Sequence, residues 1–367
     1  FYIQAFDYEM GLIGAKESGS YYTPQTVVFE TLSTIDLSHK NSVKILEPSV
    51  GMGAFLFLLL RLCDVCDKTV LDVCDCSDEA LTELKRIMKL IPYNKELIKI
   101  KYICDDFLTS RKIKKHYDLI VSNPPFAKAK KEKLSEYNKL WNVGRSNNVF
   151  AFFLDRYLTL SDEIAVVLPK SFIMATEYND IRKKYEGYAI SHIVDFGVKY
   201  FKKVFVEILS FHFKKGFKGK CIIENKLNGE KLNQEQGYIY HDKCWLLYRN
   251  DWFDKYIDTL ELDVFDVFRD RQLTNKNISL TGEIQVLRSK NVLDNGQIVS
   301  KNGYDRFIAY EDLDKYAVSK FLNSNSIIMP SFTYLTRASR LPDNCIPNGS
   351  IAILTPKKQL KNVDLSL

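Results

Sequence analysis

The stretch that decides the fold is VKILEPSVGMGAFLFLLL, residues 43–60. Its apolar start predicts a short buried strand, and residues 52–62 predict a helix. Between them, Glu47 is followed by Gly51-x-Gly53, and glycine permits a tight turn and a close approach of the backbone to a ligand. The helix would present its unpaired N–H groups to that ligand. The pattern is typical of a nucleotide-type site in an α/β fold.

Strand and helix patterns alternate around this stretch. Apolar runs predict further strands at residues 70–76, 98–104, 117–122 and 164–168, and periodic apolar positions predict helices at residues 78–90 and 148–160. This alternation favours a parallel sheet with helices on both faces. We therefore expect a first domain of α/β class over residues 1–220.

The composition of the chain changes after about residue 220. Asn, Gln, Gly and Lys become frequent, which predicts a linker or a polar hairpin over residues 221–250. A helical pattern and several short strand-like pieces separated by Asn-Gly turn signals follow. They predict a smaller α+β domain over residues 251–367.

The overall composition is that of a globular protein. The chain has 367 residues, of which 46% are hydrophobic and 27% charged, and these values exclude a disordered chain or a collagen-like fibre. No apolar run reaches the roughly 18 residues of a membrane helix, and the N-terminus lacks the basic and apolar regions of a secretory signal. We expect a cytoplasmic protein that does not enter a membrane.

Basic residues cluster in two places, and the net charge is +6. Residues 111–139 contain nine Lys or Arg against three Asp or Glu, and residues 199–220 contain seven against one. Local basic surface favours a polyanionic partner. Solvated lysine loops would give the same pattern, so charge alone does not decide.

Four of the eight cysteines have a spacing that invites a metal interpretation: Cys63-x2-Cys66, then Cys74-x-Cys76. Both pairs, however, fall in apolar helical or strand-like stretches. Buried cysteine behaves as a small hydrophobic residue. We therefore expect reduced thiols and no metal site.

The residues around the glycine turn favour an adenosine-type ligand without a pyrophosphate. Asp75 stands 22 residues past Gly53, at the end of the second predicted strand, where a carboxylate can accept hydrogen bonds from a ribose. The third glycine of a dinucleotide fingerprint is replaced by Leu56. Glu47 would repel a phosphate but would attract a cationic amine or sulfonium. These features favour S-adenosylmethionine over NAD.

The most informative segment is YDLIVSNPPFAK, residues 117–128. A buried strand runs directly into Asn123-Pro124-Pro125-Phe126, and two prolines make a rigid turn that lacks two N–H donors. The Asn123 side chain and the free carbonyls are acceptors, and Phe126 offers a flat apolar face. An exocyclic amino group on a heterocycle would find two acceptors and a ring on which to stack.

These motifs resemble the gamma subgroup of N6-adenine DNA methyltransferases of restriction–modification systems. The resemblance covers about residues 15–215 and keeps the order of the family's motifs. It rests on SYYTPQTVV (20–28), LEPSVGMGAFL (46–56), Asp75, Asp106-Phe107-Leu108, the NPPF tetrapeptide, VVLPKSFI (166–173) and VKYFKKVFVEILSF (198–211). Ser161-Asp162-Glu163 stands where the family usually has a glycine-containing turn, which affects a surface loop.

The resemblance implies a Rossmann-like fold with a seven-stranded, mostly parallel sheet, and methyl transfer from S-adenosyl-L-methionine to N6 of a flipped-out adenine. The catalytic residues would be Asn123, Pro124, Pro125 and Phe126, with Phe126 and Phe201 stacking on the base. The cofactor residues would be Tyr22, Thr23, Pro24, Glu47, Ser49, Gly51, Gly53, Asp75, Cys76, Asp106 and Phe107. An RNA adenine or a protein glutamine methyltransferase remains the alternative, since Asn-Pro-Pro-aromatic motifs occur there too.

The C-terminal part resembles the target-recognition domains of type I specificity subunits, on the stretch GEIQVLRSKNV…NGQI and on SIIMPSFTYLTRASRLPDN. The implied partner is double-stranded DNA in a bacterial cytoplasm, with a restriction subunit or a second specificity subunit as a further partner. The expected DNA contacts are Lys128, Lys130, Lys131, Arg288, Lys290, Arg337 and Arg340. Such domains come in pairs and this one is cut short, so we expect the full protein to continue beyond Leu367.

Overall fold

The computed structural model describes residues 23–113, 116–198, 206–241, 244–257, 259, 261, 264–324, 326–331 and 336–357. Two predicted site residues, Tyr22 and Phe201, lie outside the described residues. The chain divides into two compact units, Phe1–Asp251 and Trp252–Leu367.

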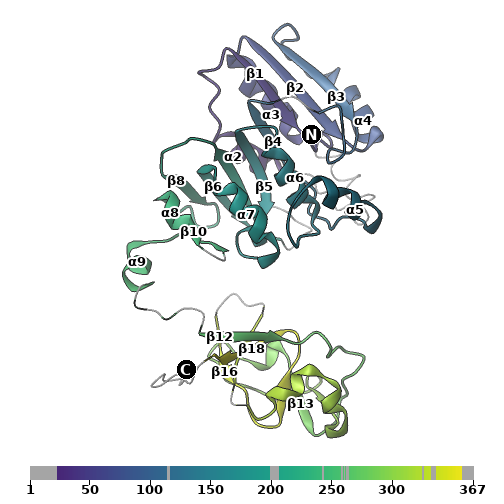
Figure 1. The fold of residues 1–367 in the computed structure, drawn as a ribbon, viewed down its shortest axis with the longest axis vertical. Helices are drawn as coiled ribbons and strands as arrows, with labels where there is room; N and C mark the ends of the chain where they lie inside the picture. The colour runs from purple at the N-terminus through teal and green to yellow at the C-terminus, as the bar shows by residue number, and fades with distance from the viewer. Residues whose placement is uncertain are drawn as a thin grey trace. The chain divides into compact units, whose positions relative to one another are not determined.

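The first unit is built on one large sheet (Figure 1). In the described residues it has nine strands in the order β3-β2-β1-β4-β5-β7-β6-β8-β9. They are β1 (Ser42–Glu47), β2 (Lys68–Asp75), β3 (Ile98–Cys104), β4 (Leu119–Ser122), β5 (Glu163–Pro169), β6 (Ala189–Gly197), β7 (Ile208–Lys214), β8 (Cys221–Asn225) and β9 (Lys231–Gln234). The first five strands in this order run parallel, and β7 runs antiparallel to both of its neighbours. The prediction of an α/β fold with a mostly parallel sheet is confirmed.

The sheet carries two strands more than the seven predicted. Segment 221–250 was expected to be a linker or a polar hairpin. Its first half forms the antiparallel pair β8–β9, and β8 is added in parallel to β6 at the edge of the sheet. Edge strands tolerate polar side chains because one flank faces solvent. The first unit therefore includes this hairpin and runs to Asp251.

Helices cover both faces of the sheet. They are α2 (Gln25–Leu32), α3 (Ala54–Leu62), α4 (Asp78–Met88), α5 (Lys131–Leu140), α6 (Val149–Tyr157), α7 (Asn179–Tyr185) and α8 (Gln236–Ile239). A further helix, α9 (Asp251–Ile257), spans the boundary between the two units and has no buried residue among those described. Buried residues of α2, α3 and α4 belong to one hydrophobic core, and those of α6 and α7 to another. In β5, Ile164, Val166 and Leu168 belong to the second core and Ala165 and Val167 to the first, as alternating side chains require.

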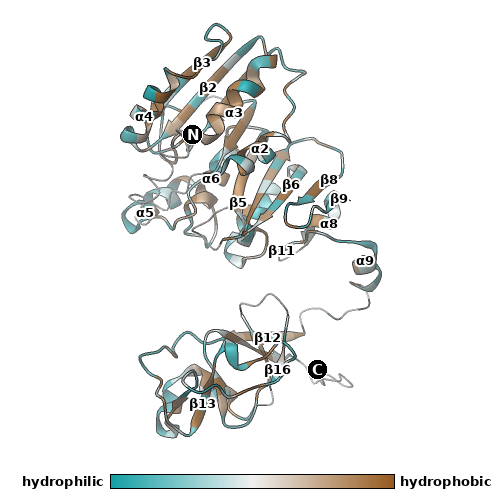
Figure 2. Cartoon of the chain, turned by 180° about the vertical axis from the view of Figure 1, so that it is seen from behind, coloured by the Kyte–Doolittle hydropathy of each residue, from teal (hydrophilic) through white to brown (hydrophobic). Residues whose placement is uncertain are grey.

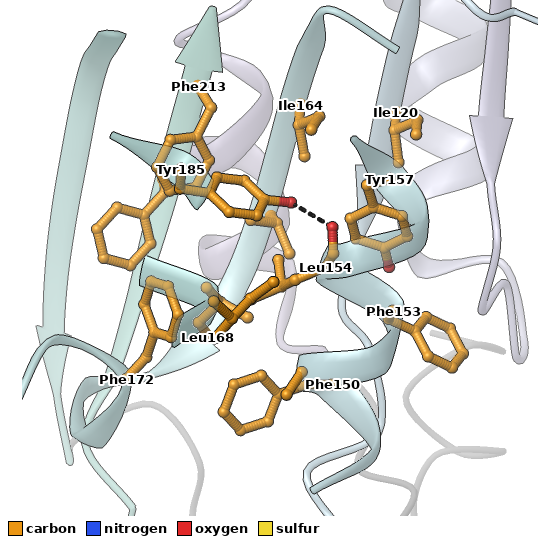
Figure 3. Packing of buried hydrophobic residues seen from close by; sticks show 14 of the residues in the cluster. Ile120, Phe150, Phe153, Leu154, Tyr157, Ile164, Leu168, Phe172, Tyr185 and Phe213 are labelled. Atoms are coloured by element: carbon orange, nitrogen blue, oxygen red, sulfur yellow. Dashed lines mark hydrogen bonds between the residues drawn. The ribbon is translucent and has the colours of Figure 1, made fainter. Parts of the chain in front are cut away.

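The face covered by α6 and α7 is aromatic (Figure 3). The Tyr185 hydroxyl of α7 donates to the carbonyl of Leu154 in α6 at 2.9 Å, which joins the two helices. Phe150 packs edge-on against Phe172 with ring centres 6.3 Å apart. These contacts hold α6 against α7 and against the segment that follows β5.

Local sequence explains where the helices begin. The Ser77 side chain accepts from the backbone N–H of Ala80 at 3.1 Å and caps α4. Gly53 precedes α3 with a φ of 84°, and a Cβ there would lie 2.6 Å from Leu84 Cδ1. The left-handed backbone conformation favours glycine at this position, and a Cβ there would also force the buried Leu84 side chain to shift.

The second unit has two small sheets in its described residues. One has the order β12-β18-β15-β16, and the other has the order β14-β13-β17. Their strands are β12 (Phe265–Arg269), β13 (Ile284–Leu287), β14 (Arg306–Ile308), β15 (Ile327–Pro330), β16 (Ser339–Arg340), β17 (Cys345–Pro347) and β18 (Ile351–Pro356). A separate hydrophobic core lies between them.

Figure 2 shows how hydrophobic and hydrophilic residues are distributed over the elements of the first unit. Hydrophobic residues predominate on α3 and along the central strands, whereas hydrophilic residues predominate on α5. Among the described residues, no helix is both long and apolar enough to span a bilayer.

Candidate active site

The predicted site residues gather at one edge of the sheet. Glu47 ends β1, Asp75 ends β2, Asp106 lies two residues beyond β3, and Asn123 follows β4 directly. These four strands are neighbours and run parallel, so their carboxyl ends lie side by side. The order of the strands reverses between β1 and β4, and ligands of open α/β sheets bind at such a switch point.

Asp75 holds the glycine loop in place. One of its carboxylate oxygens accepts from the backbone N–H of Gly51 at 2.8 Å, and the other accepts from that of Ser77 at 2.9 Å. Each carboxylate oxygen can accept two hydrogen bonds, so capacity remains for a ligand hydroxyl. Cys76, the next residue, is exposed at the same edge.

Glu47 is an acid in an environment that disfavours its charge. It is 2% exposed, and its Oε2 atom is buried without a hydrogen-bond partner among the described residues. Burial, with a smaller contribution from Asp75, raises the pKa of Glu47 well above its ordinary value. A buried carboxyl that lacks a partner fits a cationic group of a ligand, because the cation would stabilise the charged form.

The loop after β3 presents its backbone rather than its aromatic ring. The Asp106 carboxylate accepts from the backbone N–H of Leu108 at 3.0 Å and from the hydroxyl of Tyr137 at 2.8 Å. The Phe107 ring is buried, with its centre 4.7 Å from that of Phe153. Within the described residues, no backbone carbonyl accepts from the N–H of Phe107. The position can therefore offer an amide donor, while its ring belongs to the core.

Asn123 is oriented by Thr23, which comes from the N-terminal motif. Its Nδ2 donates to the Thr23 hydroxyl at 2.8 Å. Its Oδ1 is buried and finds no partner in the described part of the chain. An unsatisfied buried acceptor is unfavourable in a stable fold and marks a position where a ligand donor fits.

Phe126 ends the Asn-Pro-Pro-Phe turn that follows β4. Its half-buried ring packs edge-on against Phe150, with ring centres 6.2 Å apart, and its carbonyl accepts from Asn148 Nδ2 at 2.8 Å. Two supporting residues, Asn148 and Tyr137, were not predicted from the sequence; Asn148 holds the Phe126 carbonyl, and Tyr137 donates to Asp106. Only the helix-start position of Asn148 could have indicated its role as an N-cap.

The predicted DNA contacts have different surroundings. Lys128, Lys130 and Lys131 are exposed, shortly after the Asn-Pro-Pro-Phe turn and at the start of α5. In the second unit, Lys290 and Arg340 are also exposed.

Two predicted DNA contacts are occupied within the second unit, which the sequence did not indicate. The Arg288 guanidinium lies 3.8 Å from the centre of the Tyr304 ring and donates to the carbonyl of Tyr304. Arg337 forms an ion pair with Asp294 and donates to the carbonyl of Ser289 at 3.4 Å. Binding DNA through either arginine would require it to leave these partners.

The cysteines with zinc-like spacing lie in the interior, except one. Cys63, Cys66 and Cys74 are buried and Cys76 is exposed. Burial raises the pKa of the Cys63 and Cys74 thiols to about 12. Over the range that the structure describes, no group of three His, Cys, Asp or Glu side chains could hold a metal ion.

Comparison with known families identifies the chain. The family model of the N-6 DNA methylases matches residues 8–239, which is more than half of the chain. The chain belongs to the N-6 DNA methylase family. The cofactor of these methylases is S-adenosylmethionine, as the sequence predicted. No curated protein matches the chain.

Several solved structures align with this N-6 DNA methylase. The type IIG restriction endonuclease BpuSI aligns with a TM-score of 0.54 and 12% identity over 97% of this chain and 56% of its own. The type IIL restriction–modification enzyme MmeI, in complex with DNA, aligns with a TM-score of 0.51 and 10% identity over 94% and 63%. A modification subunit of a putative type I restriction enzyme from Vibrio vulnificus YJ016 aligns with a TM-score of 0.48 and 16% identity over 72% and 57%. This chain thus covers less than two thirds of each of these proteins.

Proposed function

We propose that this chain transfers a methyl group from S-adenosylmethionine to N6 of an adenine flipped out of double-stranded DNA. The order of its motifs, with the N-terminal motif first, supports the gamma subgroup. The observation that carries the proposal is the buried Oδ1 of Asn123 after β4, which has no hydrogen-bond partner in the described residues, together with the buried carboxyl of Glu47 at the end of the neighbouring strand β1.

The catalytic turn would hold the target amino group. Asn123 Oδ1 and the carbonyl of Pro124 would each accept one of its N–H bonds, and no backbone N–H in the described residues donates to the Pro124 carbonyl. Phe126 would stack on the base, and Phe201 is proposed to lie on its other side or edge. Two acceptors increase the electron density on the nitrogen and direct its lone pair. Catalysis would therefore rest on positioning and electrostatics.

The cofactor supplies an electrophilic methyl group on a positively charged sulfur. Glu47 and Thr23 would bind the methionine part, Asp75 the ribose hydroxyls, and Asp106 with the backbone N–H of Phe107 the adenine. The glycines at 51 and 53 would let the backbone approach the ligand, with Tyr22, Pro24, Ser49 and Cys76 lining the site. The new C–N bond forms as the C–S bond breaks, and the surplus proton leaves the nitrogen for solvent.

The second unit is proposed to recognise the DNA sequence. Its C-terminal motifs support this role, and MmeI, which shares the fold over 94% of this chain, is an enzyme bound to DNA. The exposed Lys290 and Arg340 are candidates there, together with Lys128, Lys130 and Lys131 beside the Asn-Pro-Pro-Phe turn. Arg288 and Arg337 would contribute only if they exchanged their present partners. Partners of the restriction–modification type, a restriction subunit or a second specificity subunit, are part of the proposal.

Methyl transfer from tritiated S-adenosylmethionine tests the proposal. The acceptors would be genomic DNA amplified without methylation, total RNA and a protein extract, and the labelled base would be identified after hydrolysis. Label in N6-methyladenine of DNA, lost in Asn123→Ala, is expected. Label found only in RNA, or only in protein glutamine, would show that DNA is not the substrate and would favour the corresponding alternative.

A further inference from the structure

A buried chain of three hydroxyl groups ends on the catalytic asparagine. The Tyr157 hydroxyl lies 2.7 Å from Ser122 Oγ, which lies 3.0 Å from Ser49 Oγ. Ser49 Oγ in turn lies 3.1 Å from the backbone carbonyl oxygen of Asn123. Tyr157 comes from α6, Ser122 from the end of β4 and Ser49 from the loop after β1.

The direction of the hydrogen bonds in this chain follows from proton counting. A serine hydroxyl has one proton to donate. The Asn123 carbonyl can only accept, so Ser49 donates to it and must accept from Ser122. The proton of Ser122 is thereby used, and Ser122 accepts from Tyr157. Every bond points the same way, from the core toward the catalytic turn.

The chain lies where it can act on the turn without touching a substrate. Tyr157 and Ser122 are completely buried, and burial raises the pKa of Tyr157 well above its ordinary value, so its hydroxyl keeps the proton that it donates. The Asn123 carbonyl belongs to the peptide that joins Asn123 to Pro124. A hydrogen bond to this oxygen fixes the plane of that peptide, while Thr23 fixes the side chain at the other end.

We propose that Tyr157 is a positioning residue that acts through Ser122 and Ser49 to hold the Asn123–Pro124 peptide in the conformation needed for methyl transfer. The inference rests on the proposed function, because it takes Asn123 and the Pro124 carbonyl as the acceptors of the target amino group. It goes beyond that function by giving Tyr157 and Ser122 a part in the reaction. A misplaced peptide would turn both acceptors away from the amino group.

The test uses Tyr157→Phe, with Tyr185→Phe as a matched control. Both tyrosines are completely buried on the same face of the sheet, and both donate a hydrogen bond from the phenol. Figure 3 shows the hydrogen bond from the Tyr185 hydroxyl to the Leu154 carbonyl, whereas the Tyr157 ring lies on the other side of Leu154. Each substitution removes one buried hydroxyl and keeps the ring, so a general loss of stability should be similar in the two variants.

The measurements are the single-turnover rate of methyl transfer to unmethylated genomic DNA, the Kd for S-adenosylmethionine by calorimetry, and the Tm. For Tyr157→Phe we expect a rate about tenfold lower, the effect of one hydrogen bond of about 1.4 kcal/mol, with the Kd within twofold. Tyr185→Phe is expected to keep the wild-type rate with a comparable fall in Tm. Ser122→Ala should reproduce the loss, and the double variant Tyr157→Phe with Ser122→Ala should lose no more than the larger single effect.

Three results would overturn the inference: an unchanged rate in Tyr157→Phe, an equal loss in Tyr185→Phe, or additive losses in the double variant. A wild-type protein that transfers no methyl group to DNA would instead count against the proposed function. The two failures are therefore distinguishable.

Discussion

Replacing Glu47 by glutamine should weaken the binding of S-adenosylmethionine without lowering the stability of the unliganded protein. Glu47 is 2% exposed and has a buried oxygen without a partner in the described residues. Two opposite charges about 4 Å apart attract by about 4 kcal/mol at an effective dielectric constant of about 20. The desolvation of the carboxylate opposes part of this attraction. A net loss of about 2–3 kcal/mol corresponds to roughly 30- to 150-fold weaker binding of S-adenosylmethionine.

The stability of the unliganded protein should move in the opposite direction. The pKa of Glu47 is raised in the folded state, so the folded protein keeps a proton that the unfolded chain loses above the ordinary pKa of 4.5. The contribution of this group to stability is therefore complete below that pKa and is lost as the pH rises toward the raised value. Glutamine does not titrate, so Glu47→Gln should be at least as stable as the wild type at pH 8. For the wild type, cofactor affinity should fall as the pH drops through the raised pKa.

Calorimetry with two ligands measures this prediction. S-adenosylhomocysteine has no charge on sulfur but keeps the amino group, so a loss limited to S-adenosylmethionine would place Glu47 beside the sulfonium, and an equal loss for both ligands would place it beside the amine. Glu79→Gln, which changes an exposed carboxylate at the start of α4, is the control. Binding by Glu47→Gln within threefold of the wild type would refute the reasoning.

Three further predictions concern the catalytic turn, the core and the second unit. Asn123→Ala should abolish turnover, while the Kd for S-adenosylmethionine stays within about tenfold of the wild-type value, a change of about 1.4 kcal/mol in binding free energy. Calorimetry and the tritium assay check this, and a mutant that keeps most of its rate would contradict the role of Asn123. Phe150→Ala should lower the free energy of unfolding by about 3–5 kcal/mol, because the Phe150 ring is fully buried and packs against Phe126. Urea titration measures this free energy, and a change under 1 kcal/mol would argue against this packing. A chain cut after Asp251 should bind S-adenosylmethionine but lose sequence selectivity in DNA methylation; failure of the shortened chain to fold would argue against two independent units.

Local patterns in the sequence were sufficient for the α/β class and for the positions of the main elements. The strand, glycine turn and helix of residues 43–60 depend on hydrophobic periodicity and on the conformational freedom of glycine, both of which act over a few residues. The structure has β1 at Ser42–Glu47 and α3 at Ala54–Leu62, close to the predicted positions. The Asn-Pro-Pro-Phe turn after a buried strand was equally visible, because proline restricts the backbone whatever surrounds it.

Long-range pairing was not visible in the same way. The composition of residues 221–250 predicted a linker or a polar hairpin, and the β8–β9 pair is such a hairpin. Its place in the sheet could not be predicted, because it depends on β6, which lies about thirty residues earlier. The polar helix α5 also escaped prediction. Its role depends on Tyr137 reaching Asp106, 31 positions away in the chain.

By itself the sequence determined which chemical groups exist and which of them end neighbouring strands. Only the tertiary structure decided what each group contacts. It left the Asn123 Oδ1 atom without a partner among the residues it describes, buried the ring of Phe107, and gave Arg288 and Arg337 partners inside the second unit. It also joined Tyr157, Ser122 and Ser49 to Asn123. The physical reason is that hydrogen bonds and ion pairs act over a few ångströms in space, and folding brings together groups that are far apart along the chain.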